Sequence, residues 1–125
     1  MKWQILAVAM GGAGGAVSRW LLASNIQRMT GGAFPWGTFA VNALGSLLLG
    51  FLFVWLIERS SMGELLRMCI TVGFLGAFTT FSTFSVESIH LLEEGAFGLA
   101  MGYIAGQVLL CLGLAWLGAQ IARSI

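Results

Sequence analysis

The sequence predicts an all-α integral membrane protein in which four helices cross the bilayer and one domain occupies residues 1–125. Hydrophobic residues make up 58% of the chain and charged residues only 9%, against about 25% charged residues in an ordinary soluble protein. Polar residues gather at a few places, and each of the four apolar stretches between them has at least about 20 residues, enough to cross about 30 Å of hydrocarbon. So few charges cannot form a surface that faces water.

The same composition excludes several functions. The net charge is +1, so the chain offers no basic patch for nucleic acid. One histidine, no aspartate and five glutamates leave no set of nucleophile, base and orienting group, and no phosphate-binding glycine loop is present. Cys69 and Cys111 lack a CxxC spacing, and we interpret them as buried thiols. We expect neither an enzyme nor a nucleotide-driven pump.

The first predicted helix covers residues 4–24. Lys2 followed by an apolar run resembles a signal peptide, but Arg19 and a row of glycines interrupt the place where cleavage would fall, so we expect a retained helix. Gly11 and Gly15 stand four residues apart, a spacing that lets helix backbones approach closely. Arg19 is near the helix end, where its side chain either extends to the membrane surface or attracts an anion.

The second predicted helix, residues 34–57, carries a polar face formed by Thr38, Asn42, Gly45 and Ser46. Asn42 is near mid-membrane, and its carboxamide has two donor hydrogens and an acceptor that hydrocarbon cannot satisfy. We expect Asn42 to line a pore. A hydrogen bond between helices is the structural alternative.

The third predicted helix, residues 65–92, is longer than one membrane crossing requires. Two glycines and five hydroxyl side chains in its middle disfavour a regular helix, because Ser and Thr compete for backbone carbonyls. We expect a break within residues 76–80, buried and functional, since free polar groups at membrane depth are costly. Glu87 lies one turn beyond Phe84, where it borders an aqueous vestibule or is simply hydrated.

The fourth predicted helix covers residues 96–122. Glycines recur on it every four residues, which suits packing within one bundle or at a subunit interface. Four helices can hardly enclose a pore alone, so we expect a homodimer. A polar row lies beside the glycine face and consists of Tyr103, Gln107 and Cys111.

The connectors between these helices are short and carry a weak charge bias. Four basic residues fall on the side of both termini, and two, Arg28 and Arg19, fall on the opposite side. The positive-inside rule then favours cytoplasmic termini only slightly, and a small bias permits insertion both ways. The four on the side of the termini are Lys2, Arg59, Arg67 and Arg123.

Three segments resemble the signatures of the Fluc (CrcB) fluoride channels. They are GAGGAVSR at residues 12–19, GTFAVNALGS at residues 37–46 and GFLGAFTTFSTF at residues 73–84. The segments occur in the family's order, and the four-helix length matches over essentially the whole chain. The third segment is the most specific.

This resemblance implies an antiparallel, dual-topology homodimer in a bacterial inner membrane, with two fluoride pathways along the subunit interface. It implies passive export of cytoplasmic fluoride that entered the cell as uncharged HF and ionised there. It also implies a structural sodium ion at the centre of the dimer.

The resemblance further implies a role for individual residues. Phe81 and Phe84 would coordinate fluoride with their ring edges, which bear partial positive charge. Asn42 would donate from its amide. Gly76 and Thr79 would present backbone carbonyls to sodium. The remaining pathway residues would be Thr38, Ser82, Thr83 and Tyr103. Arg19 and Glu87 would border the vestibules. On the fourth helix, Gln107 and Cys111 take two positions where the family usually has hydroxyl side chains, and their roles stay open.

Two other functions fit four short helices. A small proton-coupled drug exporter shares the length and the dual topology, but it would carry a mid-membrane carboxylate on the first helix, which here has none. A membrane scaffold without transport activity is the second alternative.

Overall fold

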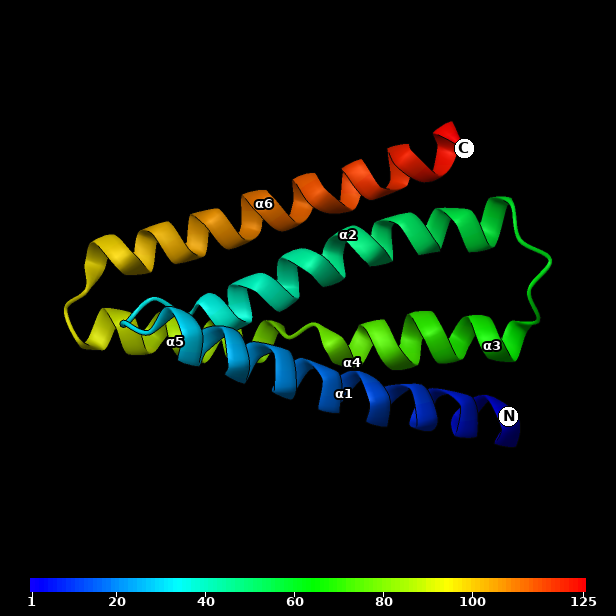
Figure 1. Cartoon of the computed structure of the whole chain (residues 1–125), viewed down its shortest axis with the longest axis horizontal. Coiled ribbons are helices and arrows are strands. Elements are labelled where there is room, and N and C mark those ends of the chain that lie inside the picture. Colours follow the sequence, from blue (N-terminus) through cyan, green and yellow to red (C-terminus); the bar gives the residue numbers. More distant parts are fainter.

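The computed structural model describes all 125 residues and contains helices as its only regular secondary structure, which confirms the prediction of an all-α protein (Figure 1). Four segments are long and apolar enough to cross a membrane: Lys2–Thr30, Trp36–Glu58, Glu64–Glu93 and Phe97–Ser124. The elements in chain order are α1 (Lys2–Thr30), α2 (Trp36–Glu58), α3 (Glu64–Met68), the π-helix η1 (Cys69–Leu75), α4 (Gly76–Phe78), α5 (Phe81–Glu93) and α6 (Phe97–Ser124).

Helix α1 continues beyond the predicted end at residue 24 and reaches Thr30. The prediction was wrong because the polar side chains of this last turn support the helix: Asn25 donates to the Leu21 carbonyl, and Arg28 donates to Asn25. The helix ends where Gly31 takes a positive φ of 64°, a conformation that glycine adopts without steric cost.

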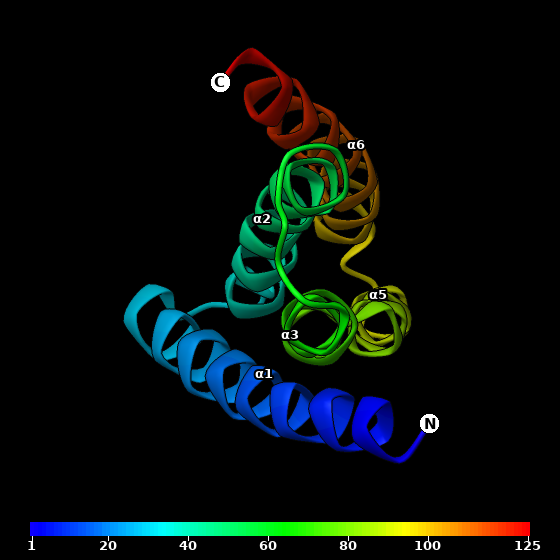
Figure 2. The ribbon, with the colours of Figure 1, turned by 90° about the vertical axis from the view of Figure 1, so that its right-hand side faces the viewer.

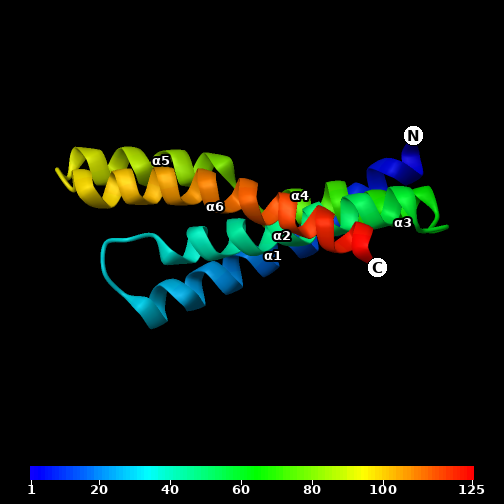
Figure 3. The ribbon, with the colours of Figure 1, turned by 90° about the horizontal axis from the view of Figure 1, so that it is seen from above.

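The four spans form an open arrangement in which α2 lies along α6, and α1 lies along η1 and α4 (Figure 1 and Figure 2). Both termini and the connector between α2 and α3 are at one end of the molecule (Figure 1). At that end Arg59 donates to the Arg123 carbonyl at 2.9 Å, and Arg123 pairs with Glu58 at 3.8 Å. At the opposite end α5 and the start of α6 diverge from α1 and the start of α2 (Figure 3).

Glycines on α1 set the distance between α1 and η1. A Cβ atom at Gly11 would overlap the Cys69 carbonyl oxygen, and one at Gly15 would overlap the Phe74 carbonyl oxygen. These glycines therefore pack within the subunit, and both are buried. Gly98 and Gly102 on α6 differ, because no atom lies within 4 Å of the Cβ position at either residue.

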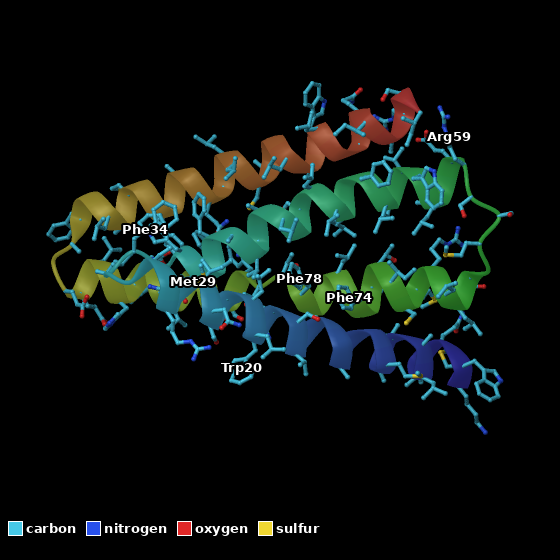
Figure 4. All side chains as sticks on the ribbon, in the orientation of Figure 1. Trp20, Met29, Phe34, Arg59, Phe74 and Phe78 are labelled. Carbon is cyan, nitrogen blue, oxygen red and sulfur yellow. The ribbon has the colours of Figure 1, made fainter.

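Most of the large apolar side chains face outward. Only 22 of 125 residues are buried, and the exposed side chains include Trp20, Phe81, Leu109 and Trp116. Figure 4 shows Trp20 pointing away from the other helices, whereas Phe74 and Phe78 lie inside the arrangement. An apolar surface of this extent fits a molecule surrounded by lipid.

The third span changes its backbone geometry twice. Residues Cys69–Leu75 form a π-helix that continues into α4, which ends at Phe78. Thr79 and Thr80 then have extended dihedral angles, with φ/ψ of −94°/158° and −152°/115°, and α5 begins at Phe81. This extended segment of two residues lies across from the middle of α2, where Thr79 approaches Gly45.

Candidate functional site

Asn42 on α2 holds the extended segment through two hydrogen bonds to one residue. The Thr80 N–H donates to Asn42 Oδ1 at 2.8 Å, and Asn42 Nδ2 donates to the Thr80 carbonyl at 3.0 Å. Both residues are buried, with exposed fractions of 8% and 9%. Since a buried backbone group without a partner is costly, this carboxamide replaces the helical hydrogen bonds that Thr80 does not make.

The hydroxyl of Thr80 begins the next helix. Thr80 Oγ1 accepts a hydrogen bond from the Thr83 N–H at 3.2 Å, which is the side-chain N-cap of α5. The same hydroxyl lies 3.0 Å from Thr83 Oγ1 and 3.4 Å from Ser82 Oγ. Three hydroxyl groups are thus gathered at the N-terminus of α5.

The carbonyl oxygens of Gly76 and Thr79 lose their usual helical donors. In a continuous helix the Thr80 N–H would donate to Gly76 and the Thr83 N–H to Thr79, but these groups donate to Asn42 and to Thr80 Oγ1. No group of three or more His, Cys, Asp or Glu side chains is placed to hold a metal ion. A hard cation at this position would therefore bind to main-chain oxygens, which suit its chemistry.

Phe81 and Phe84 lie on one side of α5 in contact with each other, with ring centroids 5.4 Å apart and an interplanar angle of 51°. Their environments differ: Phe84 is 6% exposed, whereas Phe81 is 77% exposed. The Phe84 ring also contacts the Tyr103 ring, at 5.2 Å between centroids. Within the subunit, nothing covers the outer face of Phe81.

Three helices meet at Glu87. Thr38 Oγ1 on α2 donates to Glu87 Oε1 at 2.9 Å, and Tyr103 Oη on α6 donates to Glu87 Oε2 at 2.6 Å. Both carboxylate oxygens therefore have a neutral donor, which stabilises the negative charge without a cation. The family resemblance implies a pathway role for Thr38 and Tyr103 and a vestibule role for Glu87, and in the folded chain the three side chains are hydrogen-bonded to one another.

The Tyr103 ring is enclosed by aromatic side chains that sequence reasoning missed. Phe34, in the connector before α2, meets it edge-on with 5.4 Å between ring centroids, and the centroid of Phe39 lies 6.4 Å away. Phe34 is itself anchored, because Gln27 Nε2 donates to its carbonyl at 3.1 Å. Helical periodicity cannot indicate which way the side chain of a connector residue points, so only the folded chain reveals the contact between Phe34 and Tyr103.

The polar row of α6 is connected to Asn42. Asn42 Nδ2 donates to Gln107 Oε1 at 3.3 Å, and Gln107 Nε2 donates to Cys111 Sγ at 3.0 Å. Gln107 is 4% exposed. Asn42 thus links the extended segment of the third span to α6.

Two cavities lie on either side of Thr80, which is the one residue that lines both. The first cavity has a volume of about 510 Å³ and lies between α1, α2 and α5. Its wall includes Arg19, Thr38, Thr83, Glu87 and His90. The second has a volume of about 340 Å³, and its wall includes Asn42, Phe81, Phe84, Gln107 and Cys111.

The residues predicted for a pathway therefore divide between the two cavities. Arg19, Thr38, Thr83 and Glu87 line the first, and Asn42, Phe81 and Phe84 line the second. Ser82 is exposed and lines neither cavity, although its hydroxyl lies beside Thr80.

Comparison with known proteins gives one consistent result. Residues 6–119 match the family model described as "CrcB-like protein, Camphor Resistance (CrcB)". A protein of Magnetococcus marinus named "Fluoride-specific ion channel FluC" is 47% identical over 98% of this chain and 99% of its own length. A protein of the same name from Geobacter sulfurreducens is 46% identical over 97% of this chain and 98% of its own length.

Proposed function

Because the chain belongs to the CrcB (FluC) family, a family of multi-pass bacterial membrane channels rather than enzymes, we propose that it conducts fluoride passively across the inner membrane. The observation that carries this proposal is the pair of cavities that share Thr80 as a wall residue. Their walls are largely apolar and carry uncharged donors and the rings of Phe81 and Phe84, and Arg19 is the one permanent cation among the wall residues. This composition suits a small anion that must bind and leave quickly.

Fluoride loses its hydration in such a pathway, so the protein has to replace water with many modest donors. Arg19 raises the local concentration of anions in the first cavity, which acts as a vestibule. Glu87 borders the same vestibule, and hydrogen bonds from Thr38 and Tyr103 stabilise its carboxylate. The hydroxyl of Thr83, in the wall of the first cavity, then replaces water at the N-terminus of α5, and the Ser82 hydroxyl would join it from outside the cavity wall through Thr80.

Beyond Thr80, the ion meets the edges of Phe81 and Phe84. An aromatic ring bears positive charge at its edge and negative charge on its face, so an edge attracts an anion weakly. Asn42 supports this point of the pathway by holding the backbone from which both rings project. Weak attraction by rings, in place of a cation, keeps fluoride from being trapped.

We further propose that the functional unit is an antiparallel homodimer with two pathways. The exposed ring of Phe81 lines the open second cavity, and the Cβ positions of Gly98 and Gly102 on α6 have no atom of the subunit within 4 Å. A second copy inserted in the opposite direction would cover the Phe81 ring and the open cavity, and it would separate the pathway from the surrounding lipid. Export follows from the fluoride gradient, since HF that enters from an acidic medium ionises in the cytoplasm.

A structural sodium ion fits the same arrangement. The carbonyls of Gly76 and Thr79 lack their helical donors and would hold it. The bound ion would supply positive charge that stabilises these oxygens inside the membrane.

A small proton-coupled drug exporter is not supported, because the family match is to channels and α1 carries no carboxylate. The deciding experiment is efflux from reconstituted liposomes, read with a fluoride-selective electrode and, in parallel, a chloride electrode. We expect rapid fluoride efflux and no chloride efflux. Fluoride efflux at the rate of protein-free liposomes would refute the proposed function.

A further inference from the structure

The side chain of Gln27 joins the end of α1 to the connector between α1 and α2. Gln27 Nε2 donates to the Phe34 carbonyl at 3.1 Å and to the Gly32 carbonyl at 3.4 Å. Gln27 Oε1 accepts a hydrogen bond from the Gly37 N–H at 3.1 Å, in the first turn of α2. One half-buried amide therefore holds three backbone groups of the connector and of the helix that follows it.

The connector has little else that fixes its path next to α1. Gly31 and Gly32 both take positive φ angles, of 64° and 75°, and Ala33 after them is exposed. Glycine loses more conformational freedom on ordering than any other residue, so a segment with two glycines needs contacts to keep one path. The hydrogen bonds from Gln27 supply such contacts.

The connector also covers the ring of Tyr103. The Phe34 ring meets that ring edge-on, with 5.4 Å between centroids and an interplanar angle of 86°. Tyr103 is 0% exposed, and its hydroxyl donates to Glu87 Oε2 at 2.6 Å. Gln27 holds the backbone of Phe34, Phe34 packs on Tyr103, and Tyr103 reaches the carboxylate of Glu87. Three contacts thus connect the end of α1 to Glu87.

We propose that Gln27 is a positioning residue for conduction: it holds Phe34 against Tyr103, and this contact keeps the Tyr103 hydroxyl on Glu87. The proposal rests on the proposed channel function and adds a residue outside the three segments that resemble the family signatures. Gln27 lines the first cavity, but both Nε2 hydrogens are directed to carbonyl oxygens. It therefore acts through Phe34 and not on the ion.

Fluoride efflux from liposomes tests the proposal with two variants of Gln27. Gln27→Met keeps the length of the side chain and removes its hydrogen bonds. Gln27→Asn keeps a neutral amide beside the first cavity but is one methylene too short to hold the connector. Gln120→Met on α6, equally half-buried and in the wall of neither cavity, is the matched control. Rates are taken above the leak of protein-free liposomes.

We expect both variants of Gln27 to reduce efflux by about three- to tenfold, the range that corresponds to one or two lost neutral hydrogen bonds. Gln120→Met should match the wild type. Size-exclusion elution checks each fold, and if Gln27→Met does not fold, Gln27→Asn gives the same comparison.

Double variants separate positioning from a general loss of structure. Phe34→Leu and Tyr103→Phe each remove one later contact of the series, so we expect each to slow efflux alone. The variant of Gln27 should then cause little further reduction in either background, because all three act through one series of contacts. A role in stability alone would reduce efflux by the same factor in every background.

Normal efflux through either Gln27 variant, or the full reduction by the Gln27 variant in both the Phe34→Leu and the Tyr103→Phe backgrounds, overturns the positioning role while the channel function stands. Wild-type efflux no faster than that of empty liposomes overturns both.

Discussion

Asn42 and Thr80 exchange two hydrogen bonds, at 2.8 Å and 3.0 Å, in the way that two paired residues of an antiparallel strand do. The side-chain amide of Asn42 thus makes the two hydrogen bonds that the backbone of a neighbouring strand would make. The arrangement allows an extended segment of two residues to exist in the middle of a membrane helix without free polar groups. It also explains how one polar residue of α2 determines where α5 begins.

Replacing Asn42 by Ala should destabilise the protein and abolish fluoride efflux. The substitution leaves a buried N–H and a buried carbonyl of Thr80 without partners, at a cost of about 1–3 kcal/mol each. Chemical denaturation in detergent, followed by tryptophan fluorescence, measures the loss. Asn25→Ala on α1 is the control, because Asn25 is exposed. Equal stability of the two variants would contradict the role given to Asn42.

Replacing Phe81 or Phe84 by Ile should stop fluoride efflux with different effects on stability. Phe81 is largely exposed, so its substitution should change the free energy of unfolding of the subunit little. Phe84 is buried against Tyr103, so its substitution should cost about 1–3 kcal/mol in lost packing. Phe53→Ile, at an exposed position of α2, should conduct normally. Normal efflux through both ring variants would remove these rings from the mechanism.

Replacing Tyr103 by Phe should slow efflux while keeping the aromatic contacts. The change removes the donor to Glu87 Oε2 and leaves a partly buried carboxylate oxygen without a partner. A hydrogen bond to a charged group contributes about 1.5–3 kcal/mol. In a double-mutant cycle with Glu87→Gln, we expect the effect of Tyr103→Phe on stability to shrink. Strictly additive effects would show that the two side chains are not coupled.

Replacing Gly15 by Ala should destabilise the contact between α1 and η1. The added Cβ would overlap the Phe74 carbonyl oxygen, and such overpacking costs about 1–3 kcal/mol. Gly98→Ala on α6 is the control. No atom lies within 4 Å of its Cβ position, so the higher helix propensity of Ala should stabilise the isolated subunit slightly. Thermal unfolding in detergent measures both variants. A larger loss at Gly98 than at Gly15 would refute this packing.

Chain pattern alone predicted some features of the site and missed others. The position of Asn42 on a polar face of its helix identified it, because a carboxamide at mid-membrane needs partners. Its partner was not predictable, since Thr80 reaches it only after two helices pack. No pattern in the sequence indicates that Phe34 contacts Tyr103. The helical turn at Asn25 was not predicted, because polar residues were taken to end the helix, whereas their side chains form hydrogen bonds that continue it.

The sequence by itself determined that four helices cross a bilayer. Each apolar stretch is long enough to span the hydrocarbon, and the chain has too few charged residues to form a surface that faces water. Which side chains meet was decided only by tertiary packing. Thr38, Glu87 and Tyr103 come from three helices and join at one carboxylate. Helical periodicity gives the face of each residue on its own helix, but the rotation and height of one helix against another depend on all the contacts between them.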